Sequence, residues 1–355
     1  MTMLDDLAAY QRIDPQGMLA CIRDLPHQCR TAWQEAQALT LPDDYRDIDK
    51  VVILGMGGSA IAGDFLGSLV AGESPIPIFS HRNYQLPLLV DDRTLLIASS
   101  YSGNTEEVLS AFDQGLATRA KKVVITGGGK LLAIARAKDV PAFVFDYPAE
   151  PRAALGYSFM PLLAVAQKVG LVADKNPDVD EAVAVMEGLA AHIDETVPLA
   201  RNPAKQLAQK LHQRLPVVYG AGILTPVARR WKGQLNETSK MWCFYEELPE
   251  ANHNAMVGYG LPEELAAKAL VVFLRAPSLH PRILLRYDLT QTALGEAGVE
   301  STTVDAEGKS PLAQMMSTTL FGDWVSLYLA ILNGVAPAPT PPIATLKERL
   351  ARQQA

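Results

Sequence analysis

A turn rich in hydroxyl side chains is the first candidate for chemistry in this sequence. It spans residues Ser100–Thr105, between an apolar run and a segment with the pattern of a helix. Such a turn presents unpaired backbone N–H groups and the positive end of the helix dipole to an anion. Ser100, Ser102 and Thr105 add three hydroxyl donors, and Gly103 allows the backbone to approach a ligand closely. The turn therefore predicts an anion-binding site.

The same residue types also suit an ordinary helix cap. Serine, asparagine and threonine are common at N-cap positions, and Thr105 could cap the next helix with no ligand present. The turn alone leaves these two interpretations open.

A second glycine-rich turn, Gly55–Ala60, follows the apolar run Val51–Leu54. It superficially matches the dinucleotide fingerprint, but that fingerprint needs an acidic residue about 20 residues further on. The next strand ends instead near Arg82, which would suit only a nicotinamide cofactor with a 2′-phosphate. We favour a sugar or phosphate that approaches the backbone at Gly58, with Ser59 as a hydroxyl donor. No cofactor is expected.

The elements that must position these turns alternate between strand and helix, which is typical of parallel sheets covered on both faces. In the first half the expected strands are Val51–Leu54, Ile76–Phe79, Leu95–Ala98, Val123–Thr126 and Ala142–Phe145. The expected helices are one that runs to Leu69, then Glu106–Gln114 and Leu131–Lys138, with the pair Phe159–Val169 and Val179–Glu195 further on.

The same order of elements recurs from Pro216, where an apolar run leads to a glycine turn and a helix at Pro226–Leu235. This predicts an internal duplication of the fold. The second copy lacks the hydroxyl-rich turn, so the anion site is assigned to the first domain. Later elements are expected at Met241–Glu246, Ala269–Leu274, Glu300–Val304 and, as a long helix, Ser310–Leu332.

Four segments follow from this pattern. Residues 1–46 form a helical N-terminal segment, 47–152 a first domain, 153–334 a second domain, and 335–355 an extended strap with a final helix. The prolines around Glu150 predict a hinge at 148–152. The strap contains too many prolines for a helix or a central strand, and it would carry Thr340 and Lys347 towards a site.

Composition narrows the classes of protein. With 355 residues the chain favours two domains, and its net charge of −7 argues against a nucleic-acid partner. The three cysteines have no close pair, the N-terminus has no basic signal region, and no apolar run is expected to reach the length needed to span a bilayer. We therefore expect a cytoplasmic protein with no metal site and no membrane partner.

Four motifs together resemble the bifunctional phosphoglucose/phosphomannose isomerases: Gly55–Ser59, Ser100–Thr105, Asn236-Glu237 and His253-Asn254. Those proteins have two sugar isomerase (SIS) domains. The resemblance covers nearly the whole chain, including the proline-rich strap and the lysine-bearing helix after it. It implies two doubly wound α/β domains. It also implies reversible isomerisation of glucose 6-phosphate, mannose 6-phosphate or both with fructose 6-phosphate, through a cis-enediolate.

The resemblance also implies a role for each matching residue. Ser59, Ser100, Ser102 and Thr105 would bind the sugar phosphate, with Gly58 beside them. Glu237 would move the proton between C1 and C2, and Arg152 would stabilise the enediolate. His253, supplied by the partner in a homodimer, would open the sugar ring together with Lys347, for which Lys309 is an alternative. Thr340 would lie beside the sugar.

The residues themselves leave alternatives. A carboxylate is a weak base for a proton α to a carbonyl, so Glu237 needs an apolar wall, for which Trp242 and Phe244 are the candidates. An exposed helix-end carboxylate and an exposed surface arginine would be the ordinary roles of Glu237 and Arg152. The asparagines beside His253 could fix its tautomer.

Other functions are also possible. They include another phosphosugar isomerase and a phosphosugar sensor, although residues 1–46 contain no basic recognition helix. A glucosamine 6-phosphate amidotransferase needs a glutaminase domain that begins with cysteine, whereas this chain begins Met1-Thr2-Met3.

Overall fold

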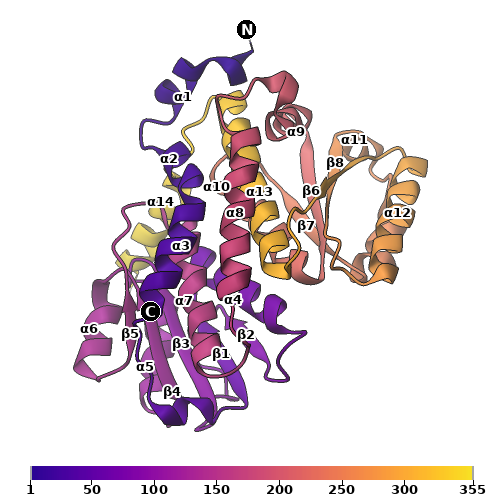
Figure 1. Ribbon diagram of the computed structural model, residues 1–355. Coiled ribbons are helices and arrows are strands. Elements are labelled where there is room, and N and C mark those ends of the chain that lie inside the picture. Colours follow the sequence, from indigo (N-terminus) through magenta and orange to yellow (C-terminus); the bar gives the residue numbers. More distant parts are fainter. Residues whose placement is uncertain (1, 354–355) are drawn as a thin grey trace.

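Two parallel sheets form the framework of the protein in the computed structural model, which describes residues 2–353 (Figure 1). The first sheet has the order β2-β1-β3-β4-β5 and the second has the order β7-β6-β8-β9. The strands are β1 (Lys50–Leu54), β2 (Ile78–His81), β3 (Thr94–Ser100), β4 (Lys121–Thr126), β5 (Ala142–Val144), β6 (Leu215–Ala221), β7 (Phe244–Leu248), β8 (Ala269–Arg275) and β9 (Glu300–Asp305).

The strand order places the two candidate turns side by side. In each sheet the first strand has its successor on one side and the third strand on the other, which creates a switch point at the carboxyl ends of the strands. Ligands of parallel α/β sheets bind at such switch points. In the first sheet Leu54 pairs with Ala98, so the turns that follow β1 and β3 are neighbours.

Helices cover both sheets and fill the space between them (Figure 1). They are α1 (Leu7–Ile13), α2 (Met18–Arg23), α3 (Leu25–Ala36), α4 (Gly57–Val70), α5 (Glu106–Leu116), α6 (Gly129–Ala137), α7 (Leu155–Lys168), α8 (Asn176–Ile193), α9 (Pro203–Leu211), α10 (Thr225–Glu237), α11 (Glu263–Ala266), α12 (Pro281–Glu296), α13 (Pro311–Asn333) and α14 (Pro341–Arg352).

The predicted fold class of two parallel-sheet α/β units is confirmed, and most expected elements are present. The expected strand at 241–246 is misplaced, since β7 begins only at Phe244 and continues to Leu248. Helices α9 and α12 were not predicted, since both lie in stretches without an assigned element. The domain limits stay a prediction: α7 follows residue 152 but packs against α3 and α4, which precede it.

Helix α13 is the long central helix of the second unit. It packs against α8, α9 and α10, and nearly all of its residues from Leu312 to Ile331 are buried. Its length and apolar composition would allow it to cross a bilayer, so the expectation that no segment reaches that length is wrong. However, 89% of the apolar window is buried inside the protein, as in the core helix of a globular domain.

Candidate active site

A cavity of about 330 Å³ lies where α4 and α10 meet. Among the described residues that line it, five are cationic and one, Glu237, is a carboxylate. The cationic residues are Arg82, Arg152, Arg229, Arg230 and Lys232. Arg82 and Arg229 are both paired with Asp64, and Arg230 is paired with Asp323. The lining itself is still mostly cationic, which favours an anionic ligand although the whole protein is acidic.

The cavity brings Arg152 and Glu237 together. Arg152 lies in the short 3-10 helix η3 (Pro151–Ala153) and is only 6% exposed. Its Nη1 atom lies 3.7 Å from Oε2 of Glu237 and 3.5 Å from Oε2 of Glu150. Burial lowers the pKa of the guanidinium, but an arginine in a protein stays protonated. The side chain is therefore a fixed cation beside the candidate base, which rules out an exposed surface arginine.

The strap predicted from the prolines fixes this arginine. Arg152 Nη2 donates to the carbonyl oxygens of Pro337 and Ala338, both at 2.7 Å. Its Nε donates to Oγ1 of Thr238 at 3.4 Å. The guanidinium is held from two directions, and Nη1 is left to face the carboxylates.

A buried ion pair between Arg230 and Asp323 contacts the backbone of Arg152. Arg230 Nη2 lies 2.6 Å from Oδ2 of Asp323 on α13 and donates to the carbonyl of Arg152 at 3.1 Å. Gln234 donates to the other oxygen of Asp323 at 2.8 Å. The Nε of Arg230 has no partner within residues 2–353, although this side chain lines the cavity. An oxygen of a bound ligand or water would satisfy it.

The hydroxyl turn does not have the geometry of a simple side-chain cap. Thr105 occupies the N-cap position of α5, but its hydroxyl lies 2.8 Å from that of Ser100. Within the described chain no side chain caps the first turn of α5. The interpretation of Thr105 as only a side-chain cap is therefore wrong. The hydroxyl of Ser102 is exposed, and accepts from the Asn104 amide at 3.2 Å.

Two glycines allow the backbone to follow this path. Gly103 has φ +63°, and a methyl group there would lie 1.8 Å from the carbonyl oxygen of Gly128. Gly58, in the first turn of α4, would bring a methyl group within 3.0 Å of the carbonyl oxygen of Pro151. Ser59 follows it and is buried. Any larger residue at Gly103 would displace the turn.

Trp242 and Phe244 do not form the apolar wall that was predicted around Glu237. Trp242 and Phe244 are 72% and 41% exposed and pack against each other, with ring centroids 5.0 Å apart. The apolar surface of the cavity comes instead from Ile61 and Tyr245. The side chain of Glu237 is 35% exposed, so it is only partly buried, and it contacts Arg152.

Of the predicted residues, only Gly58, Arg152 and Glu237 line this cavity in the described chain. The hydroxyl residues Ser59, Ser100, Ser102 and Thr105 do not line it, and neither do the residues expected to open the ring. His253 is exposed in the 3-10 helix η6 (Glu250–His253), and Lys347 lies on α14, which has no buried residue. Thr340 is the N-cap residue of α14, two residues past Ala338. Lys309 is exposed in a loop held by Glu181 through backbone hydrogen bonds.

The proposal that neighbouring asparagines fix the tautomer of His253 is wrong. The side chain of Asn252 bonds to Thr290 and Arg286, and that of Asn254 bonds to Glu250 and to the backbone of Ala255. Both amides are therefore engaged elsewhere.

Lys240 is a cation that the sequence analysis missed. Its ammonium group donates to the carbonyl oxygen of Glu237 and, at 3.0 Å, to that of Pro337. The available signal was its position, three residues after the candidate base.

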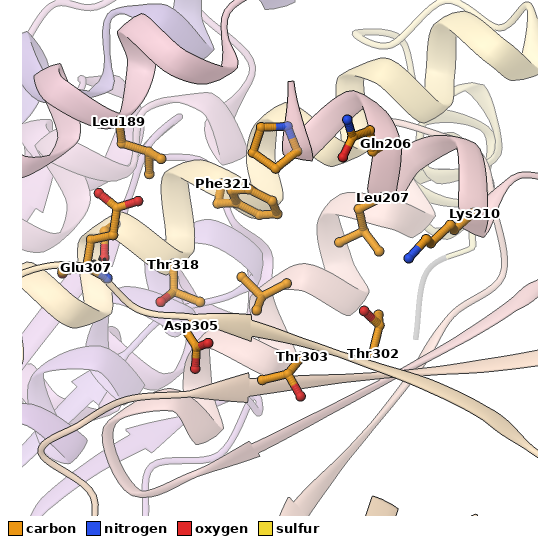
Figure 2. Close-up of a pocket in the computed structure, with 13 residues that line it drawn as sticks. Leu189, Gln206, Leu207, Lys210, Thr302, Thr303, Asp305, Glu307, Thr318 and Phe321 are labelled. Carbon is orange, nitrogen blue, oxygen red and sulfur yellow. Dashed lines mark hydrogen bonds between the residues drawn. The ribbon is translucent and has the colours of Figure 1, made fainter. Parts of the chain in front are cut away.

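A second cavity of about 320 Å³ lies between α8, α9, β9 and α13 (Figure 2). Phe321, Leu207 and Leu189 contribute to its apolar part, and Asp305 and Glu307 are its two carboxylates. Asp305 is already paired with Arg275, whose Nε lies 2.6 Å away. None of the predicted site residues lines this cavity, so we place the chemistry at the first one.

The fold and the hydroxyl turn define a two-domain SIS protein. Residues 200–350 match the model of the bacterial phospho-glucose isomerase C-terminal SIS domain. A bifunctional phosphoglucose/phosphomannose isomerase from Caldicellulosiruptor bescii is 40% identical over 337 residues, which cover 94% of this chain and 99% of the relative. The chain belongs to the family of bifunctional phosphoglucose/phosphomannose isomerases.

Solved structures show the same fold at lower identity. A hypothetical protein from Thermus thermophilus aligns with a TM-score of 0.72 at 21% identity, covering 98% of this chain and 93% of that one. The C-terminal domain of glucosamine-fructose-6-phosphate aminotransferase from Francisella tularensis aligns with a TM-score of 0.72 at 15% identity, covering 91% and 98%. At these identities the likeness concerns the fold alone.

Proposed function

We propose that the protein is an aldose–ketose isomerase that interconverts glucose 6-phosphate and mannose 6-phosphate with fructose 6-phosphate. The observation that carries this proposal is the Arg152–Glu237 pair in a mostly cationic cavity that Gly57 and Gly58, at the start of α4, also line. Family membership agrees with it, and a non-catalytic phosphosugar sensor would not need a fixed cation beside a carboxylate.

In the proposed mechanism the phosphate binds Ser100, Ser102, Thr105 and Ser59, close to the uncapped N-termini of α4 and α5. The sugar extends from there past Gly58 to Glu237. The phosphate contacts are the same before and during the reaction, so they fix the position of the substrate without taking part in proton transfer.

Glu237 then removes the proton from C2 of the open-chain aldose. The resulting negative charge develops on the enediolate oxygens, where the Arg152 guanidinium stabilises it. As the hydroxyl proton moves from O2 to O1, Glu237 returns its proton to C1 and the ketose forms. The reverse path, with the proton delivered to C2, regenerates an aldose. Thr340 would lie beside the sugar and help admit both C2 epimers.

Ring opening requires an acid–base group, and we assign it to His253 with Lys347 across a homodimer interface. Two observations support this assignment: both residues are exposed, and both lie outside the cavity of their own chain. Helix α14 also exposes Ile343, Leu346 and Leu350, an apolar face that a second subunit would cover. Lys309 is also exposed and outside the cavity, but its loop is held to Glu181 of its own chain.

We propose a cytoplasmic location, since the three cysteines are free thiols and two of them are buried. The sugar phosphate is the only ligand in this proposal, which includes no nucleic acid, membrane, metal or cofactor.

A coupled assay with fructose 6-phosphate tests the function directly. We expect both glucose 6-phosphate and mannose 6-phosphate to form at rates that a metal chelator does not change. Loss of activity with the chelator, or the absence of both products, would contradict the proposal.

A further inference from the structure

Lys240 has an unusual backbone for its residue type. Its φ is +56°, a left-handed conformation that costs a lysine more than a glycine. The residues before it hold it there: the Ser239 hydroxyl donates to the carbonyl of Ser326 on α13 at 2.7 Å, and Asn333 donates to the carbonyl of Ser239 at 3.0 Å. Because this backbone conformation costs conformational energy, it suggests that the side chain of Lys240 has a role.

The side chain connects two segments that are far apart in sequence. The ammonium group donates to the carbonyl oxygen of Glu237, in the last turn of α10, and to that of Pro337 in the strap. Arg152 Nη2 donates to the same Pro337 oxygen at 2.7 Å. One strap carbonyl therefore accepts from both cations, and the strap residues 337–340 contribute no ionisable group of their own.

The charges around Lys240 come from three residues. Arg152 opposes the ammonium charge, while Glu237 and Glu150 favour it. Burial has the largest effect, and together with Arg152 it lowers the pKa of Lys240 to about 8. The ammonium is mostly protonated at pH 7 and becomes a neutral amine as the pH rises through 8.

We propose that Lys240 is a positioning residue for the isomerisation, because its ammonium ties the strap to the end of α10 and so fixes Arg152 beside Glu237. This inference rests on the proposed roles of those two residues. A neutral amine makes weaker hydrogen bonds to carbonyls than an ammonium does. Deprotonation therefore loosens the strap, and kcat falls on the alkaline side.

The test compares kcat and KM between pH 6 and pH 10 for the wild type, Lys240→Gly and Lys240→Arg. Glycine suits the left-handed backbone but has no ammonium, so we expect kcat at pH 7 to fall about 10-fold to 100-fold, the scale of a small misplacement of catalytic groups. KM should change less, and the fall of kcat near pH 8 should disappear. Arginine keeps its charge, so in that variant the alkaline fall should move up by more than one pH unit.

Gln213→Gly is the matched control. Gln213 is also a non-glycine residue with positive φ, at +63°, and it is exposed and distant in sequence from the site. Its kcat profile should match the wild type. A wild-type alkaline fall that persists unchanged in Lys240→Gly, or an unchanged kcat in that variant, would overturn the inference.

The failure of the inference and the failure of the proposed function are distinguishable. If Glu237→Gln stays active, the assigned base is wrong and the function fails, whatever Lys240 does. If Glu237→Gln is inactive and Lys240→Gly behaves as wild type, only the positioning role of Lys240 is wrong. Thermal unfolding of each variant confirms that it folds.

Discussion

The two switch points of the duplicated fold carry turns of opposite character. After β3, Ser100 and Thr105 bond to each other and no side chain caps α5 within the described residues. After β8, the side chains of the corresponding turn make hydrogen bonds within the protein. His280 Nδ1 accepts from the Arg282 amide at 3.1 Å at the start of α12, and Ser278 donates to Gln314 on α13 at 2.5 Å.

This difference indicates that the two copies of the fold have different roles. In the first unit the helix N-terminus has no side-chain cap within the described residues, whereas in the second unit the equivalent position is closed by internal hydrogen bonds. The second unit instead contributes α10, whose last turn carries Glu237. We infer that the first unit holds the substrate and the second supplies the proton-transfer group.

The largest expected effect separates these two roles. Glu237→Gln removes the base and leaves the hydroxyl turn intact, so kcat should fall by about 10³-fold or more while phosphosugar binding persists. Calorimetric titration with fructose 6-phosphate and the coupled assay measure the two properties. Glu263→Gln, an exposed carboxylate on α11, is the control and should behave as wild type.

The same variant tests whether the second unit also serves a neighbouring subunit. Glu237→Gln and His253→Ala are each expected to be inactive, but a hybrid dimer would contain one site with both residues intact. Activity should reappear when the two proteins are mixed and allowed to exchange subunits. A mixture that stays inactive although exchange is demonstrated would place both residues in one chain.

A pair of serine substitutions compares the turns directly. Ser102→Ala removes one hydrogen bond to a charged phosphate, so binding should weaken by ~1–3 kcal/mol, visible as a higher KM with kcat little changed. Ser278→Ala alters the closed turn of the second unit and should leave KM unchanged. If both substitutions changed KM equally, the proposed difference between the two turns would be wrong.

The smallest effect concerns stability. His280→Ala removes the side-chain cap of α12, which should lower the free energy of unfolding by about 1 kcal/mol. Chemical denaturation measures that loss, and isomerase activity should not change. A drop in activity without a drop in stability would assign a functional role to the second turn.

Local patterns were enough to predict much of this protein. Runs such as Leu95–Ala98 are apolar because β3 is buried on both faces. The anion-binding role of Ser100, Ser102 and Thr105 stays a prediction. Contacts between distant segments were not predictable in the same way. The pairing of Arg230 with Asp323 spans 93 residues, and no periodicity encodes it.

Side-chain surroundings were the least predictable feature. Trp242 and Phe244 are apolar enough for such a wall, but Trp242 just before β7 and Phe244 at its start are both exposed. Likewise, the asparagines beside His253 are close in sequence yet bond to Thr290, Arg286 and Glu250. Lys240 was overlooked because its importance lies in the strap that it contacts, about a hundred residues further on.

The strap also has a consequence for the order of events during synthesis. Arg152 leaves the ribosome 185 residues before Pro337, the first of its two carbonyl acceptors. Both domains can therefore emerge and begin to fold, N-terminal unit first, while the guanidinium still lacks its fixed position. A nascent chain stalled before the strap would have the proposed phosphate turn and the proposed base, but Arg152 would lack its carbonyl acceptors. If the proposed roles hold, such a fragment would bind a sugar phosphate without converting it, and activity would arise only when the proline segment docks.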